Sequence, residues 1–181
     1  MREPDLLEVA GYQHGYFTAA QAVAAGVSHR ALTGRVHRGI IERVARGVYR
    51  MAHYPVTSRD DLYILQVLAP GSLVSHETAL EVYALSDVLP RTIHITVPVA
   101  SGMKPRPGVT IHRSDVPSAD RTIRDDLRVT GLTRTLLDCA RTGSAPEQLL
   151  MAVREGRARG MLRPADIARL RAVYPFRGRI R

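Results

Sequence analysis

A run of helix caps and glycines between residues 15 and 51 constrains the fold more than any other part of the chain. Thr18 has the side chain of a helix N-cap, and Gln21, three residues later, completes a capping box. Gly26 is placed to end this helix in a left-handed conformation, and Ser28 is placed to cap the next one. Two short helices joined by so tight a turn predict a helix-turn-helix.

A β hairpin is expected directly after the second helix. Gly39 ends that helix, and the runs that follow, IIERVA and GVYRM, are rich in β-branched residues. The two runs meet around residues 45–47, which places a turn between them. A helix-turn-helix with a basic hairpin attached is a winged helix, and a short helix over residues 3–13 would support it.

The predicted winged helix is strongly basic. Residues 28–50 contain six arginines against one acidic residue, Glu42. Leu32 and Val36 share the inward face of the second helix, so its outer face is polar and basic. Such a face can contact the phosphates and base edges of nucleic acid, and we therefore expect it to bind double-stranded DNA. The alternative is a winged helix that binds only protein. The residues expected to contact DNA are Ser28, His29, Arg30, Thr33, Arg35, Arg38, Arg43, Arg46 and Arg50.

Composition narrows the partners and the cellular location. The 181-residue chain has a formal net charge of +9 and a pI of about 10.5, which favours a polyanionic partner. Its one cysteine, Cys139, excludes an internal disulfide and a cysteine-based zinc cluster. No signal peptide or long apolar run is present, so we expect a cytoplasmic protein with no membrane contact. Nine arginines follow residue 153, and this basic tail is either a solvated helical surface or a second nucleic-acid contact.

The sequence changes character after a linker around Pro55. We expect helices over residues 59–69, 76–86, 133–141, 147–160 and 165–173, and strands over residues 72–75, 91–98, 108–114, 121–124 and 127–131. The predicted fold class is therefore α+β. A winged helix-turn-helix domain, residues 1–54, is followed by a mixed α+β domain with a small sheet and the basic tail, residues 55–181.

The histidines do not predict a catalytic or metal site. His94 and His112 lie in two predicted strands and could face each other across a sheet. We interpret them as a structural pair, because a metal site would need further ligands. Ser75, His76 and Glu77 read as the start of a helix, where sequence neighbours point in different directions. We therefore expect no metal ion and no cofactor.

The acidic residues also fall short of a nuclease or a nucleotidyltransferase. Four aspartates lie between residues 115 and 126, but no Glu-x-Lys sequence follows them, and Lys104 is the one lysine of the chain. The Gly71-Ser72 turn lacks the paired carboxylates that metal-dependent nucleotidyl transfer requires. We expect a protein without catalytic activity, and an enzyme that its winged helix delivers to DNA is the alternative.

Several stretches resemble a known family. The sequence FTAAQAVAAGVSHRALTGRVHRGIIERVARGVYRM is similar to the N-terminal winged helix of AbiEi-type antitoxins. The stretches RDDLYILQVLAPGSLVSHETALEVYAL, TIHITVP, GVTIHRS and VTGLTRTLLDCAR resemble the second domain of the same group. The resemblance runs from about residue 11 to residue 170, and the order of the motifs carries it more than any single motif.

The resemblance implies a transcriptional repressor that serves as the antitoxin of a type IV toxin–antitoxin pair. Such proteins repress their own operon, and their second domain counteracts a nucleotidyltransferase-like toxin without a stable complex. By position, the helix that begins at Ser28 would enter the major groove of an operator upstream of the protein's own operon. We expect a monomer in solution that pairs on inverted repeats. A module that docks an acidic toxin through the basic tail is a further alternative.

Overall fold

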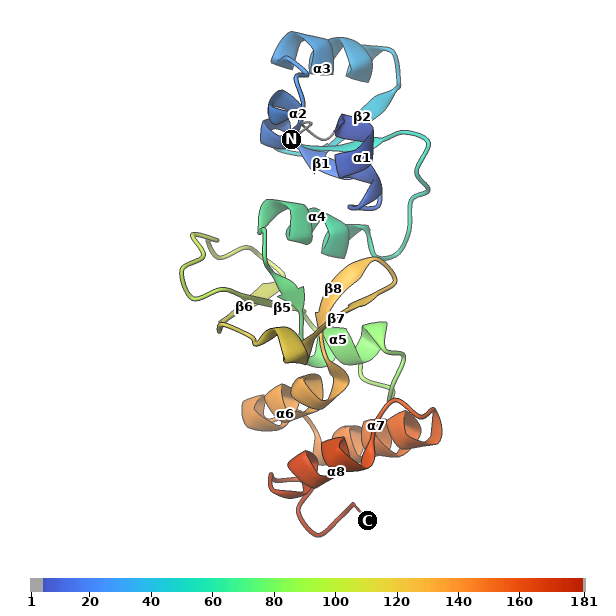
Figure 1. Ribbon diagram of the computed structural model, residues 1–181, viewed down its shortest axis with the longest axis vertical. Coiled ribbons are helices and arrows are strands. Elements are labelled where there is room, and N and C mark those ends of the chain that lie inside the picture. Colours follow the sequence, from blue (N-terminus) through green and yellow to red (C-terminus); the bar gives the residue numbers. More distant parts are fainter. Residues whose placement is uncertain (1–4, 181) are drawn as a thin grey trace. The chain divides into compact units, whose positions relative to one another are not determined.

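The chain divides between Pro70 and Gly71 into two units in the computed structural model, which describes residues 5–180 (Figure 1). The boundary expected near residue 54 lies earlier in the chain. The difference arises because helix α4 (Asp60–Leu68) packs against two strands of the N-terminal unit and so belongs to it.

The N-terminal unit is a winged helix with α4 added at its end. Its elements are α1 (Leu6–Gly11), β1 (Tyr16–Thr18), α2 (Ala19–Ala24), α3 (His29–His37), β2 (Ile41–Ala45), β3 (Val48–Met51) and α4. A helix-turn-helix made of α2 and α3, followed by the hairpin of β2 and β3, is the arrangement predicted from the sequence. Helix α1 corresponds to the helix expected over residues 3–13, of which residues 3 and 4 lie outside the described part of the chain.

Strand β1 is the element of this unit that the sequence does not predict. It pairs antiparallel with β3, and β3 pairs antiparallel with β2 on its other side, so β3 is the central strand. Tyr16 and Phe17 of β1 are fully buried. A strand of three residues is too short to display the alternation of polar and apolar side chains by which strands are recognised.

The helix caps predicted from the sequence are confirmed. The Thr18 hydroxyl accepts a hydrogen bond from the Gln21 backbone N–H at 3.1 Å, and the Gln21 side chain accepts one from the Thr18 N–H at 2.8 Å. Ser28 Oγ accepts a hydrogen bond from the Ala31 N–H at 3.2 Å, at the start of α3. Gly26, with a φ of 79°, leaves α2 in the left-handed conformation. These local contacts fix the turn that sets α3 at an angle to α2.

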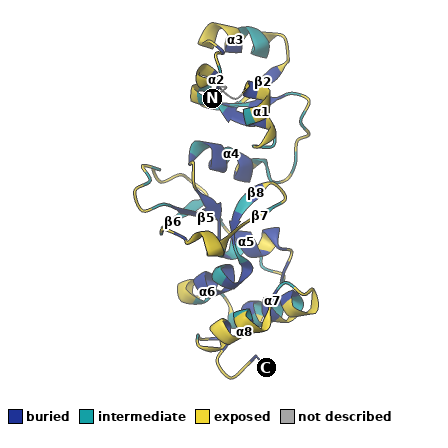
Figure 2. Ribbon diagram, in the orientation of Figure 1, coloured by how far each residue is buried: buried dark blue, intermediate teal, exposed yellow. Residues whose placement is uncertain are grey.

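An apolar cluster holds the helices of this unit against its sheet (Figure 2). Leu6 of α1, Phe17 of β1 and Leu32 of α3 are each at most 2% exposed. The cluster also contains Ala10, Ala22, Val27, Ile41 and Met51. Because a large apolar side chain contributes about 1.5–3 kcal/mol when it is fully buried, this cluster is the main source of stability of the winged helix.

Among its described residues, the second unit combines a mixed sheet with four α-helices and one short 3-10 helix (Ser118–Asp120). Its elements are β4 (Leu73–Val74), α5 (His76–Val82), β5 (Ile93–Val97), β6 (Val109–Arg113), β7 (Arg121–Arg124), β8 (Leu127–Thr130), α6 (Leu132–Thr142), α7 (Pro146–Ala158) and α8 (Pro164–Arg171). The sheet order is β6-β5-β4-β8-β7, in which the β5–β6 and β4–β8 pairs are parallel and the other two pairs are antiparallel. The predicted α+β class is confirmed.

Helix α6 is central among the helices of the second unit. It packs against α5, α7 and α8, and Figure 1 shows these helices gathered beside the sheet. Cys139 on α6 is fully buried, and burial raises the pKa of its thiol to about 12. Cys139 is therefore an unreactive core residue. Within residues 5–180, no helix is long and apolar enough to cross a membrane.

The capping box allows a direct test of the helix-turn-helix. Replacing Thr18 with Val removes the hydroxyl that caps α2 and should destabilise the protein by about 1 kcal/mol, as measured by urea denaturation. Thr122→Val, at an exposed position of β7, is the matched control and should change the free energy of unfolding by less than about 0.5 kcal/mol. Equal effects of the two substitutions would contradict a stabilising role for the cap.

Candidate nucleic-acid interface

Helix α3 is held by one face and presents the other to solvent. Leu32 is 1% exposed and anchors the helix in the apolar cluster, and Val36 packs beside it. Gly39, with a φ of 67° in the left-handed region, follows the C-cap of α3 and ends the helix as predicted. The exposed residues predicted to contact DNA from this segment are Ser28, His29, Arg30, Thr33 and Arg38, and Arg35 is half-buried (Figure 2).

Two contacts organise the outer face of α3. The Thr33 hydroxyl donates to the His29 carbonyl oxygen at 3.1 Å, so Thr33 presents mainly its methyl group and its remaining lone pairs. A Cβ at Gly34 would meet Arg38 Nη1 at 3.4 Å, so the Arg38 side chain lies back along the helix. The absence of a side chain at Gly34 therefore leaves room for an arginine of the helix itself.

The hairpin of β2 and β3 forms the wing and carries two exposed arginines. Arg43 lies on β2, and Arg46 lies in the turn beside Gly47, whose φ of 75° suits glycine. Tyr49 is the cross-strand partner of Arg43, and its ring stacks on Phe17 at a centroid distance of 5.8 Å. The wing is thus anchored through its apolar side, and its arginines are free to face a polyanion.

Arg50 lies elsewhere than the sequence analysis expected. It is 5% exposed, on the central strand β3, and its Nη2 donates to Glu42 Oε2 at 2.6 Å. Its Nη1 lies 3.7 Å from Asp60 Oδ2 at the start of α4. Because this guanidinium is enclosed and paired with two carboxylates, Arg50 stabilises the domain and we exclude it from the interface.

Asp60 and Tyr16 complete the surroundings of Arg50. Burial by itself raises the pKa of Asp60, but the Thr57 N–H and hydroxyl, which both donate to Asp60 Oδ1 at 2.9 Å, and the charge of Arg50 hold it below its ordinary value. Burial raises the pKa of the Tyr16 hydroxyl, and the negative charge of Asp60 raises it further. Asp60 is therefore ionised at neutral pH, as its pairing with Arg50 requires.

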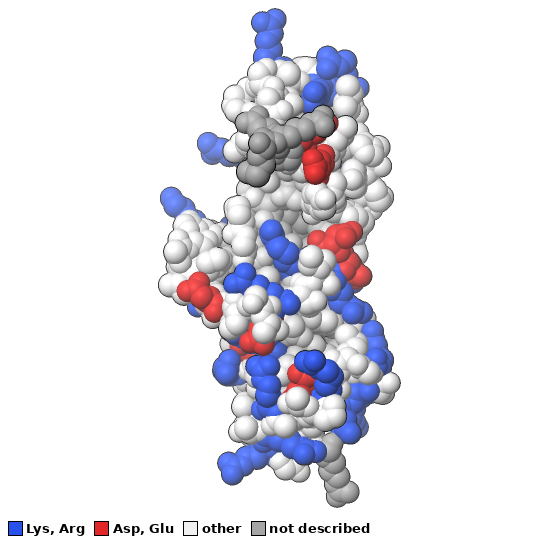
Figure 3. Space-filling view, in the orientation of Figure 1, with Lys and Arg blue, Asp and Glu red and all other residues white. Residues whose placement is uncertain are grey.

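The remaining arginines of the winged helix face outward. They are Arg30, Arg35, Arg38, Arg43 and Arg46. Figure 3 shows basic side chains projecting from the part of the N-terminal unit that carries α3. A helix that exposes cations beside a basic wing can contact phosphates on both sides of a groove and place side chains against base edges.

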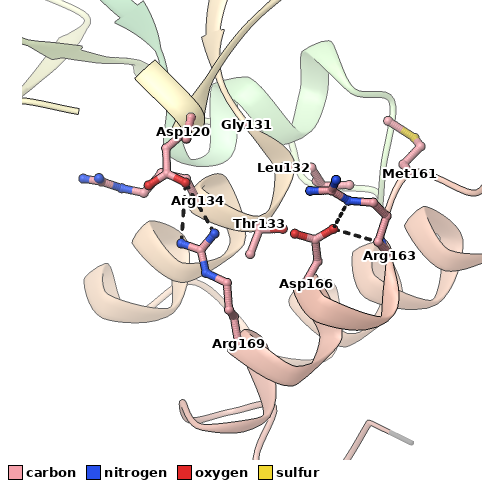
Figure 4. A pocket seen from close by; sticks show the side chains of 10 residues that line it. Asp120, Gly131, Leu132, Thr133, Arg134, Met161, Arg163, Asp166 and Arg169 are labelled. Carbon is pink, nitrogen blue, oxygen red and sulfur yellow. Dashed lines mark hydrogen bonds and ion pairs between the residues drawn. The ribbon is translucent and has the colours of Figure 1, made fainter. Parts of the chain in front are cut away.

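The basic tail makes contacts within the second unit. Arg163 Nε lies 3.2 Å from Asp166 Oδ2, and Arg169 Nη1 lies 3.5 Å from Asp120 Oδ1, around a cavity of about 280 Å³ (Figure 4). The Asp166 carboxylate also bonds to Thr133 in the first turn of α6. The Asp166 carboxylate occupies the place beside these arginines where a bound anion would otherwise lie. These contacts therefore favour a structural role for Arg163 and Arg169.

The aspartates that raised the nuclease alternative have separate surroundings. Asp115 Oδ1 accepts a hydrogen bond from the Val99 N–H at 3.1 Å. Asp125 and Asp126 occupy the turn between β7 and β8, both with positive φ. In the described part of the chain, the one group of three or more side chains that could hold a metal ion consists of histidines.

The predicted pairing of His94 with His112 is confirmed, and a third histidine joins it. His94 Nδ1 lies 3.1 Å from His112 Nε2, and the ring of His76 stacks on His112 at a centroid distance of 3.5 Å. Burial lowers the pKa of all three imidazoles, and neighbouring positive charge adds to the effect at His76, whose pKa is about 3. All three are therefore neutral at neutral pH.

The fold and the exposed basic surface define the N-terminal unit as a winged-helix domain of the DNA-binding, transcription-regulating class. Residues 4–52 match the family described as "Transcriptional regulator, AbiEi antitoxin". The N-terminal domain is therefore an AbiEi-type winged helix, which confirms the resemblance over this part of the chain.

One solved structure is similar over most of the chain. A crystal structure of the RV2827C protein from Mycobacterium tuberculosis is similar with 16% sequence identity and a TM-score of 0.47, covering 89% of this chain and 72% of that chain. A search of curated proteins found no match.

The two kinds of arginine in the wing differ in their expected effect on stability. Arg50→Ala should destabilise the protein by about 2 kcal/mol, because it leaves Glu42 and Asp60 without their buried cation. Arg46→Ala, at an exposed turn position, should change the free energy of unfolding by less than about 0.5 kcal/mol. Chemical denaturation followed by circular dichroism measures both, and equal losses would contradict the assignment of Arg50 to the interior.

Proposed function

We propose that this protein is a sequence-specific DNA-binding repressor that acts as the antitoxin of a type IV toxin–antitoxin pair. The observation that carries the proposal is the exposed, arginine-bearing face of α3 in a domain that matches the AbiEi antitoxin regulators. Helix α3 would enter the major groove, and the wing would contact the adjacent backbone or minor groove. No bound cofactor is required for either contact.

The contacts divide by position on the domain. His29, Arg30 and Thr33 lie in the first turns of α3, where a recognition helix meets base edges, and Arg35 follows on the same helix. Arg38, Arg43 and Arg46 lie at the end of α3 and on the wing, where phosphates are the expected partners. Ser28 caps α3 and would contact a phosphate near the helix N-terminus.

The biological partners follow from the family of the N-terminal domain. The operator would lie upstream of the protein's own operon, and inverted repeats would recruit two copies of a chain that is monomeric in solution. The second unit would counteract a nucleotidyltransferase-like toxin without forming a stable complex with it. Both activities would take place in the cytoplasm.

Binding to the protein's own promoter is the first test. In a gel-shift titration, DNA from upstream of the gene should stay bound in the presence of excess unrelated DNA. With the three arginines Arg38, Arg43 and Arg46 on phosphates, the logarithm of the binding constant should fall with the logarithm of salt concentration at a slope of about −3. Arg46→Ala should make this slope shallower by about one.

Arg106→Ala serves as the control for the salt dependence, because Arg106 is exposed in the loop before β6 of the second unit. This substitution should leave the slope unchanged. Complete loss of the promoter complex to unrelated DNA would instead indicate non-specific binding and defeat the repressor proposal.

Base recognition by α3 is tested separately from affinity. Arg30→Ala and Arg35→Ala should relax discrimination at single operator positions, by about 1–3 kcal/mol each, because an arginine that bonds to a guanine edge loses that preference. Affinities for a panel of operators with one base pair changed at a time measure the effect. If both substitutions weaken every DNA equally, these side chains contact phosphates and base recognition lies elsewhere.

A further inference from the structure

Three histidines of the second unit meet at one place in the fold. His76 begins α5, His94 lies on β5, and His112 lies on the parallel strand β6. One ring nitrogen from each residue lies within 4.8 Å of the other two. The three side chains come from separate elements that are distant in sequence, so their convergence is a property of the fold.

The spacing of the nitrogens is close to that of ligands around one ion. His94 Nδ1 and His112 Nε2 are 3.1 Å apart. Two nitrogens bound tetrahedrally to zinc at about 2.0–2.1 Å lie about 3.3 Å from each other, so this pair needs little adjustment. The nitrogen of His76 is the third, within 4.8 Å of both.

Hydroxyl groups hold the ring nitrogens that would not bind the ion. His76 Nδ1 lies 2.9 Å from Ser75 Oγ, and Ser75 Oγ accepts a hydrogen bond from the Thr96 hydroxyl at 2.9 Å. With Nδ1 of His76 donating to Ser75, its Nε2 carries the free lone pair. His94 Nε2 lies 3.4 Å from the Thr92 hydroxyl, which leaves its Nδ1 facing His112. Metal-binding histidines are oriented by such partners on the second nitrogen.

The backbone around His76 departs from what a helix start prefers. His76 has a φ of 53°, in the left-handed region, although it is neither glycine nor asparagine. Ser75 is the N-cap of α5 but its hydroxyl makes no capping bond, since it faces His76 instead. A non-glycine residue in this conformation costs about 1–3 kcal/mol, and such strain persists where surrounding contacts hold it and concentrates at functional sites.

A cavity beside the histidines leaves space for a fourth ligand. It has a volume of about 160 Å³, and His76 and His112 lie on its wall with Ser114 and Asp138. Both carboxylate oxygens of Asp138 are engaged, by Arg134 at 2.7 Å and by Arg141 at 3.1 Å. A water molecule in the cavity would therefore take the fourth position.

We propose that His76, His94 and His112 form a binding site for a divalent transition-metal ion of the zinc class, with its fourth position open to the cavity. Neutral imidazoles are the nitrogen ligands that zinc takes in proteins, and three of them with one water are a known zinc donor set. On binding, the proton between His94 and His112 moves to the other nitrogen of the ring that carries it, so each imidazole stays neutral and one ion links α5, β5 and β6. The three histidines belong to the second unit, and the proposal does not depend on the proposed repressor function.

The test is a zinc titration of the whole chain, without an affinity tag and after treatment with EDTA, in competition with a chromophoric chelator. One tightly bound zinc ion per chain is expected. His94→Gln and His112→Gln should each weaken binding by about 100-fold or more, since residues that only orient a ligand already contribute about 10–100-fold. Ser75→Ala, which frees the His76 ring, should weaken it by about tenfold with the same stoichiometry.

The matched control is His53→Gln, which removes an exposed imidazole from the N-terminal unit and should leave zinc affinity unchanged. If a variant does not fold, nitrogen-15 NMR of the wild-type protein tests the same three ligands without a substitution. Zinc should shift the ring nitrogens of His76, His94 and His112 and leave those of His53 in place. Absence of binding, binding that survives both glutamine substitutions, or unshifted rings at zinc saturation would each overturn the proposal.

Discussion

The N-terminal domain depends on a buried guanidinium. Arg50 is the cross-strand partner of Tyr16 on β1 and of Glu42 on β2, and it also faces Asp60 of α4. Arg50 thus stands opposite a residue of each other strand, and its guanidinium forms ion pairs with Glu42 of β2 and Asp60 of the helix added after the wing. Because a shift of one residue would turn Arg50 to the other face of the sheet, this contact specifies the register of the wing. Apolar packing supplies most of the stability of the domain, and the ion pairs of Arg50 specify which strand register the packed domain adopts.

The same pairing explains why burial of an arginine does not weaken the basic surface. Arg50 and Glu42 neutralise each other, and Glu42 is the one acidic residue between residues 28 and 50. Five arginines then face outward with no acid of that segment opposing them. The net charge counted from the sequence therefore describes the surface correctly, although it assigns Arg50 to the wrong side of the domain.

The sequence predicts the features of this fold that depend on near neighbours. Capping by Thr18 and Gln21 needs residues three apart, and the turn at Gly26 needs a single left-handed residue, so both are visible in the chain itself. Strand β1 depends on pairing with β3, whose residues lie 30 to 34 positions further along the chain, and α4 is attached by packing on both strands. No local pattern marks either contact. Helical phase predicts the outward arginines of α3, and the predicted hairpin turn places Arg43 and Arg46 on or beside its tip, whereas the burial of Arg50 follows from partners on two other elements.

The histidine cluster of the second unit also depends on contacts between distant residues, which the sequence predicts only in part. The parallel register of β5 and β6 places Thr96 opposite His112, so His94 and His112 meet diagonally, which two predicted strands could suggest. His76 joins them with a left-handed backbone and beside a Ser75 that makes no capping bond, and neither departure is visible in the sequence. In a cluster held by hydrogen bonds alone, both departures would cost stability for the sake of one stacked ring. An ion bound by all three imidazoles would offset that cost, and it accounts for the geometry of the cluster with a single cause.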